Sequence, residues 1–88
     1  MTDYEILLEI KDNLKETNTY FRIKKEDVLD YLIEKSKITG KLPKKLHIQR
    51  NELNTNILND FLEKLKYSVL YEEKYSKEVG FYYIVNLT

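Results

Sequence analysis

The strongest constraint on how this chain folds is one continuous apolar stripe between residues 50 and 65. Its hydrophobic side chains recur at helical spacing and are Leu53, Ile57, Leu58, Phe61, Leu62 and Leu65. A stripe with this period defines an amphipathic helix, which must bury its apolar side against other parts of the chain. We therefore expect a helix over residues 50–65. Its opposite, solvent-facing side is expected to carry Gln49, Arg50, Asn51, Asn54, Thr55 and Asn59.

The hydrophobic period changes after this helix. Residues 67–75 and 81–87 are rich in aromatic and β-branched side chains, and residues 76–80 between them have the composition of a turn. Two such segments joined by a short turn are typical of a β-hairpin. The sequence thus predicts a hairpin from about 67 to 87.

Two more helices are expected in the N-terminal half. Apolar residues at helical spacing predict one helix over residues 3–16 and another over residues 25–36. Residues 17–19 break the first helix, and the β-prone residues 20–23 predict a short strand between the two. Gly40 and Pro43 then interrupt regular structure before the long helix.

Length and composition limit the class of protein. Eighty-eight residues suit a single domain, and 42% hydrophobic with 34% charged residues is ordinary for a globular chain. The absence of cysteine excludes disulfides and thiolate chemistry, and a lone His47 cannot form a histidine metal cluster. No apolar run reaches the roughly 18 residues of a membrane span, and the start is too acidic for a signal peptide. We expect a cytoplasmic protein with no membrane contact, no cofactor and no metal.

The net charge is zero, but the charges are unevenly distributed. Residues 1–16, 17–34 and 52–88 each carry a net negative charge. Residues 35–51 contain no Asp or Glu, and their basic side chains are Lys35, Lys37, Lys41, Lys44, Lys45 and Arg50. Such a cluster is either a solvated loop or a contact with an acidic partner.

The order of helix, short strand, helix, basic turn, long helix and hairpin resembles that of the winged helix-turn-helix superfamily. Within residues 42–53, Leu42, Leu46, Ile48 and Leu53 fall on the apolar positions of its helix-turn-helix core. Pro43 and His47 depart from the Ala and Gly that are usual there. The resemblance implies an α+β fold with three to four helices, a short strand near 20–23 and a C-terminal two-stranded hairpin, the wing. It also implies one domain, 1–88, with an N-terminal helix 3–16, a core 20–66 and a wing 67–87.

Two arrangements of the basic segment fit this resemblance. In the first, residues 41–47 form a short helix that leads into the long one, and this is the version that we favour. In the second, residues 3–16 and 25–36 are the first two helices, and residues 44–48 approach the third helix in an extended conformation. Both versions place residues 50–65 at the position of the recognition helix.

Winged-helix domains bind DNA by laying the third helix into the major groove. The resemblance therefore implies sequence-specific binding of double-stranded DNA by a small transcriptional regulator. The abundance of Lys, Asn, Tyr and Ile is typical of an AT-rich genome, either of a low-GC bacterium or thermophilic archaeon or of one of their viruses or plasmids. Arg and Asn side chains suit the edges of guanine and adenine. The expected base contacts are Arg50, Asn51, Asn54 and Thr55. The expected phosphate contacts are Lys41, Lys44, Lys45, Gln49, Lys74 and Lys77.

A homodimer is also expected, because one winged helix covers a single half-site. The N-terminal helix would supply its contacts through Tyr4, Leu7 and Leu8. The competing interpretation is a protein-interaction module, or a small viral inhibitor of a host protein, which fits the zero net charge and the acidic N-terminal helix. An enzyme is not expected, because the chain lacks an evident nucleophile with its base, a metal cluster and a Gly-rich phosphate loop.

Overall fold

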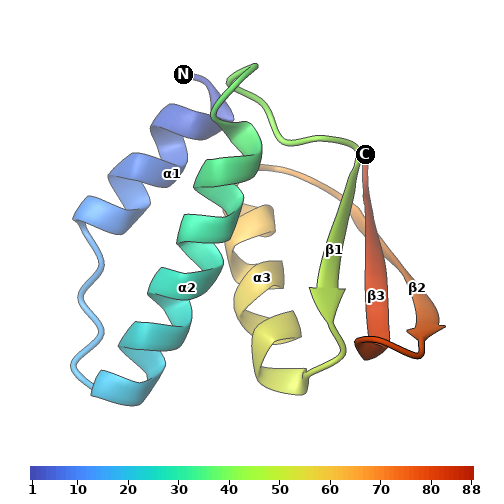
Figure 1. Cartoon of the computed structure of the whole chain (residues 1–88). Helices are drawn as coiled ribbons and strands as arrows, with labels where there is room; N and C mark the ends of the chain where they lie inside the picture. The colour runs from blue at the N-terminus through green and yellow to red at the C-terminus, as the bar shows by residue number, and fades with distance from the viewer. The chain divides into compact units, whose positions relative to one another are not determined.

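The protein has an α+β fold with three helices and one three-stranded antiparallel sheet (Figure 1). The computed structural model describes all residues from Met1 to Thr88. The elements are α1 (Asp3–Asp12), α2 (Thr19–Ser36), β1 (Lys45–Gln49), α3 (Glu52–Lys64), β2 (Val69–Ser76) and β3 (Gly80–Leu87). The chain divides into two compact units, residues 1–42 and residues 43–88. None of the three helices combines the length and the apolar character needed to cross a lipid bilayer.

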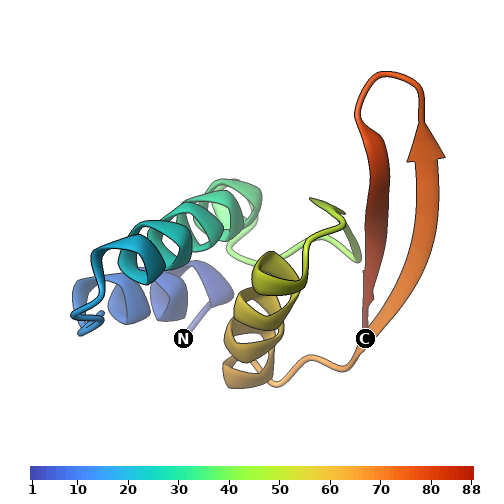
Figure 2. The ribbon, with the colours of Figure 1, turned by 90° about the horizontal axis from the view of Figure 1, so that it is seen from below.

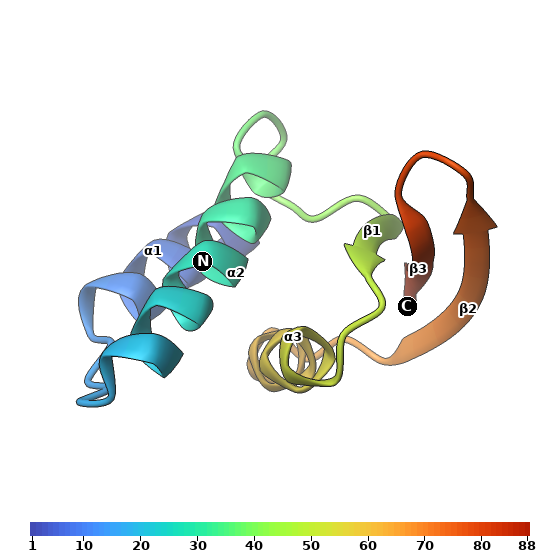
Figure 3. The same ribbon diagram turned by 60° about the horizontal axis from the view of Figure 1, so that its bottom comes forward.

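In the first unit, α1 and α2 lie side by side (Figures 1 and 3). A capping box starts α1, in which the Thr2 hydroxyl accepts from the Glu5 amide and the Glu5 carboxylate accepts from the Thr2 amide. Two ion pairs stabilise this unit. Lys11 of α1 lies 2.5 Å from Asp30 of α2, and Glu16 in the loop between the helices lies 2.8 Å from Lys25 of α2. The helix predicted over 3–16 is therefore present but ends at Asp12.

The predicted short strand at residues 20–23 is wrong, because these residues form the first turns of α2. The side chain of Asn18 caps this helix by accepting from the Phe21 amide at 3.1 Å. Arg22 and Glu26, one turn apart, lie on one side of the helix with their charged groups 3.9 Å apart. A good N-cap at the start of an 18-residue helix outweighs the β preference of four residues.

In the second unit, the helix predicted over 50–65 and the hairpin predicted over 67–87 are both confirmed, as α3 and as β2 with β3. The turn between the two strands closes at Gly80, whose φ of 80° lies in the left-handed region that glycine adopts without strain. The helical version of residues 41–47 is wrong. Residues 45–49 instead form β1, as in the extended alternative, and β1 pairs antiparallel with β3.

Alternation along β1 explains this outcome. Leu46 is buried and lies opposite Val85 of β3, while the flanking Lys45 and His47 are exposed. A period of two suits a strand with one covered face, and pairing with β3 supplies hydrogen-bond partners for the backbone of these residues, most of which a short helix would leave unsatisfied. The sequence of this segment therefore favours a strand over a short helix.

The sheet has the strand order β1-β3-β2, and α3 lies against one of its faces (Figure 3). That face carries Leu46, Val85 and Leu87, all buried. Tyr71 of β2 reaches across to α3, where its hydroxyl donates to the side-chain oxygen of Asn59. Burial against the helix raises the pKa of Tyr71. The other face, with Lys45, His47 and Gln49, is turned away from α3.

The ion pair between Glu16 and Lys25 predicts a pH dependence of the first unit. The Lys25 ammonium and then the Asn18 amide hold the pKa of Glu16 below its ordinary value of 4.5. Because the folded-state pKa is lowered, this contribution to stability is complete above about pH 4.5 and is lost as the pH falls through the folded-state pKa. We expect Lys25→Met to raise the Glu16 pKa toward its ordinary value, measured by carbon-detected NMR titration. Lys24→Met is the control, and an unchanged Glu16 pKa in Lys25→Met would contradict the pairing.

The N-cap of α3 gives a second prediction. The side-chain oxygen of Asn51 accepts from the amides of Leu53 at 2.9 Å and Asn54 at 3.2 Å. Removing such a cap costs about 1 kcal/mol, so Asn51→Ala should destabilise the protein by that amount in denaturant unfolding. Asn56→Ala is the matched control, because Asn56 is exposed on the same helix and should change stability little. Equal stability of the two variants would show that the cap is not formed.

Candidate nucleic-acid interface

The most cationic part of the second unit is the segment of residues 44–51, called the connector below. It comprises Lys44, the strand β1, and the two residues Arg50 and Asn51 that join β1 to α3. Lys44, Lys45 and Gln49 are exposed. The backbone of this segment is fixed by the pairing of β1 with β3, so its side chains project from a defined surface rather than from a loose loop.

Lys44 and Lys45 have no carboxylate partner. Neither side chain forms an ion pair, whereas Lys11, Lys25, Arg50 and Lys74 each lie within 4.0 Å of a carboxylate oxygen. The carbonyl of Lys44 accepts from the amide of Leu87 at 2.8 Å, which anchors the backbone beneath the side chain. These two lysines are therefore positive charges that the protein positions but does not neutralise.

Arg50, a predicted base contact, is held against the hairpin. Its Nη1 donates to Oε1 of Glu73 at 2.6 Å, and its guanidinium carbon lies 4.4 Å from the centre of the Phe81 ring. Its backbone amide donates to the carbonyl of Phe81 at 3.3 Å. The Arg50 side chain is still about two-fifths exposed, at 43%. Arg50 thus reaches solvent, but with its charge already paired.

The other predicted base contacts are engaged within α3. Asn51 is the N-cap, and the Thr55 hydroxyl donates to the Asn51 carbonyl at 2.8 Å. Asn54 and Thr55 are half-buried. An Asn placed directly before Glu-Leu at the start of an amphipathic stripe is a cap signal in the sequence itself. That signal competes with the interpretation of Asn51 as a free reader of bases.

The side of α3 that is most exposed is acidic. Its exposed residues are Glu52, Asn56, Asp60, Glu63 and Lys64. The polar face expected from the sequence lies partly on the half-buried flank instead, with Asn54, Thr55 and Asn59. The feature of the sequence that indicates this acidic side is the recurrence of carboxylates at Glu52, Asp60 and Glu63. Only the N-terminal end of α3, next to the connector, is suited to a polyanion.

The hairpin carries the two other predicted phosphate contacts. Lys77 is exposed in the turn, while Lys74 is exposed on β2 with its ammonium 3.8 Å from the Glu72 carboxylate. Beside the turn lie large exposed apolar side chains, Tyr75 at 63%, Val79 at 64% and Phe81 at 47%. The rings of Tyr75 and Phe81 have their centres 5.0 Å apart. The hairpin end therefore mixes cations with apolar surface.

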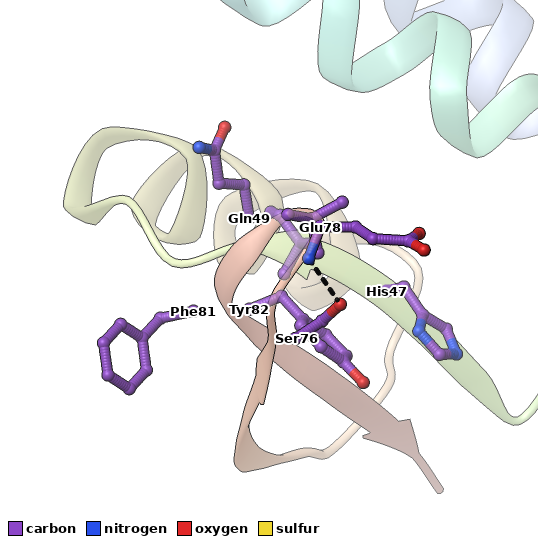
Figure 4. Close-up of a pocket in the computed structure, with 8 residues that line it drawn as sticks. His47, Gln49, Ser76, Glu78, Phe81 and Tyr82 are labelled. Carbon is purple, nitrogen blue, oxygen red and sulfur yellow. Dashed lines mark hydrogen bonds between the residues drawn. The ribbon is translucent and has the colours of Figure 1, made fainter.

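An open concavity of about 640 Å³ lies between β1 and the hairpin turn (Figure 4). It is lined by His47, Ile48, Gln49, Ser76, Glu78, Val79, Phe81 and Tyr82. The rings of His47 and Tyr82 are nearly parallel, with centres 5.9 Å apart, and the Ser76 hydroxyl accepts from the Glu78 amide at 3.2 Å. This concavity could not be predicted from the sequence, because it depends on the pairing of β1 with β3. No group of three or more His, Cys, Asp or Glu side chains is placed to hold a metal ion.

The remaining predicted residues lie in the first unit. Lys41 is exposed at its end. The prediction of Leu7 as a dimer contact is wrong, because its side chain is 0% exposed and has no surface left for a partner. Tyr4 is half-buried, and Leu8 is 36% exposed. The apolar stripe of α1 thus serves the protein's own core at its centre.

Comparisons of the chain with protein-family models, with curated proteins and with solved structures gave no match.

Proposed function

We propose that this protein binds double-stranded DNA through the connector of residues 44–51 and the wing, the hairpin formed by β2 and β3. The observation that carries this proposal is the pair Lys44 and Lys45, both exposed and without a carboxylate partner. Cations held in this way release condensed counterions from DNA when they meet its phosphates, which is the main source of affinity for the duplex.

The arrangement of the second unit supports a winged-helix type of docking. A helix is followed directly by a hairpin, and a preceding strand joins the hairpin's second strand to give the order β1-β3-β2. The strand β1 occupies the segment in which a helix-turn-helix would have its first helix. DNA would therefore be approached by the N-terminal end of α3 and by the wing, with the acidic C-terminal half of α3 directed away from the phosphates.

Phosphate and base contacts are divided between different side chains in this proposal. Lys44, Lys45 and Lys77 contact phosphates, which positions the protein without reading sequence. Arg50 is the base contact, and it leaves Glu73 to reach a guanine. An exposed ion pair such as Arg50 with Glu73 contributes only about 0–1 kcal/mol. A good bidentate contact with a base is worth about 1–3 kcal/mol, so the exchange favours DNA.

A sequence-specific binder of this size acts by occupying its site, as a small transcriptional regulator in the cytoplasm does. The role of Asn51 is revised accordingly: it orients α3 as its cap and contributes to recognition only through that helix.

A second candidate function is docking to another protein. It is favoured by the exposed Tyr75, Val79 and Phe81 at the end of the wing, next to the guanidinium of Arg50. Aromatic side chains and Arg are the residues most enriched at the centres of protein interfaces. In this alternative the wing carries the affinity and the two connector lysines contribute little.

Selection of bound sequences from a random pool of duplex DNA tests the proposal in one experiment. Enrichment of a defined site supports specific binding, and retention without enrichment supports contact with the backbone alone. No retention at low salt contradicts DNA binding and leaves the protein-docking alternative.

Removing the connector lysines should reduce affinity for all sequences alike. In Lys44→Ala/Lys45→Ala, two phosphate contacts are lost, so the slope of log affinity against log salt should become shallower by about 2. Fluorescence anisotropy with a labelled duplex at several salt concentrations measures this slope. Lys64→Ala/Lys66→Ala is the matched control, because it removes the same charge from the other end of α3. Equal slopes for the two double variants would contradict the role of the connector.

Releasing Arg50 from its carboxylate should strengthen specific binding. Glu73→Gln removes the acceptor charge at 2.6 Å and leaves the guanidinium free to reach the duplex. We expect affinity for the selected site to rise by a few-fold, in line with the roughly 0–1 kcal/mol of an exposed pair. Glu78→Gln is the control, since it makes the same charge change in the turn without touching Arg50. If both variants gain equally, only the net charge matters and Arg50 does not contact DNA.

A further inference from the structure

The strand β2 forms an open edge of the sheet. In the order β1-β3-β2 it has a neighbour on one side only, and no element of the second unit lies beyond it (Figures 2 and 3). Ser68 and Thr88 exchange both backbone hydrogen bonds, each at 3.0 Å, which fixes the alternation along the ladder. The backbone amides and carbonyls of the even-numbered residues of β2 therefore form hydrogen bonds with β3. The amides and carbonyls of Val69, Tyr71, Glu73 and Tyr75 point outward along the free edge.

This edge lacks most of the features that prevent strands from pairing. Edge strands are commonly shortened, bent by a bulge, interrupted by proline or covered by another element. The strand β2 spans eight residues without proline, and its register with β3 is unbroken from Val69 opposite Leu87 to Ser76 opposite Gly80. It also carries exposed apolar side chains, Leu70 at 69% and Tyr75 at 63%. Only the charges at its centre, Glu72, Glu73 and Lys74, could oppose pairing.

Those central charges are complementary to their own copy. We propose that β2 pairs antiparallel with β2 of a second copy of this chain, about a two-fold axis at Glu73, to give a continuous six-stranded sheet. In this register, Glu72 of each copy lies opposite Lys74 of the other, so two opposite-charge pairs form on the same face of the sheet. Tyr71 of each copy lies opposite Tyr75 of the other on the face that carries α3.

Neighbouring registers are worse for the same residues. The backbone amides and carbonyls on the free edge of β2 belong to odd-numbered residues, and these must lie opposite odd-numbered residues of the second copy. The two-fold axis can therefore pass through any residue of β2, and the neighbouring registers move it by one residue. An axis at residue 72 places two Glu72 side chains opposite each other, and an axis at residue 74 does the same with two Lys74 side chains. The axis at Glu73 alone pairs both charges with their opposites.

The remaining like-charge contact is compensated within each copy. An axis at Glu73 brings the two Glu73 side chains opposite each other, which by itself would oppose pairing. Each Glu73, however, accepts from the Arg50 guanidinium at 2.6 Å. Two carboxylates and two guanidinium groups then alternate at the centre, and their net charge is zero. The occupant that this edge fits is therefore the same strand of a second copy.

Charge reversal tests both the partner and the register. Native mass spectrometry and sedimentation at high micromolar concentration should give the wild-type chain a mass of about twice 10.7 kDa. Glu72→Lys and Lys74→Glu should each weaken self-association by roughly tenfold or more, because each converts both cross-strand pairs into repulsive ones. When the two variants are mixed, every opposed pair is again of opposite charge, so a one-to-one heterodimer should form. The double variant Glu72→Lys/Lys74→Glu should self-associate like the wild type.

The outcomes separate this proposal from DNA binding and from misfolding. Recovery in the mixture or in the double variant requires folded chains and is independent of any DNA. A wild-type chain that stays at 10.7 kDa at every concentration overturns the proposal and leaves the edge for a strand of another protein. Single variants that dimerise as tightly as the wild type, or a mixture that gives no heterodimer, overturn it as well, because the dimer would then use another surface.

Discussion

The antiparallel pairing of β1 with β3 is the interaction on which the second unit depends. It places Leu46 opposite Val85 beneath α3. It also makes residues 45–49 a strand, within the stretch 35–51 that has six basic side chains and no carboxylate. Because β1 is held to β3, two residues, Arg50 and Asn51, are enough to join β1 to α3. The position of the lysines, the direction of α3 and the concavity beside the turn all follow from this single pairing.

The same residues that suggested a binding surface also hold the fold together. Asn51 caps α3, and Arg50 joins β1 to the hairpin through Glu73 and Phe81. Capping satisfies helix amides that would otherwise lack partners, so Asn51 has a structural role whether or not a ligand is bound. Arg50 differs, because an exposed ion pair exchanges partners at small cost. In the proposed function, binding therefore rests foremost on Lys44 and Lys45, which form no ion pair in the folded chain.

Charge differs between the elements of the structure, although the net charge of the chain is zero. Two lysines without an ion pair, Lys44 and Lys45, lie near the N-terminal end of α3, and exposed carboxylates lie along its side at Glu52, Asp60 and Glu63. On β2, Glu72 and Lys74 carry opposite charges on the same face, so the strand complements a second copy that runs in the reverse direction, and Glu73 is neutralised by Arg50. In the two proposals a duplex contacts the connector and the turn of the wing, whereas a second copy contacts the free edge of β2. The Arg50–Glu73 pair takes part in both, because Arg50 would leave Glu73 to contact DNA and would neutralise Glu73 in the dimer.

The sequence by itself determined the elements whose signals are local. The stripe from Leu53 to Leu65 specified α3, and the turn ending at Gly80 specified the hairpin, because helical periodicity and left-handed turn geometry are readable from neighbouring residues. Tertiary structure decided the rest. Residues 45–49 form a strand through pairing with residues 33 to 41 positions later, and the charge of Arg50 is paired with Glu73, 23 residues away. No local pattern encodes such partners, since they meet only after the chain has folded.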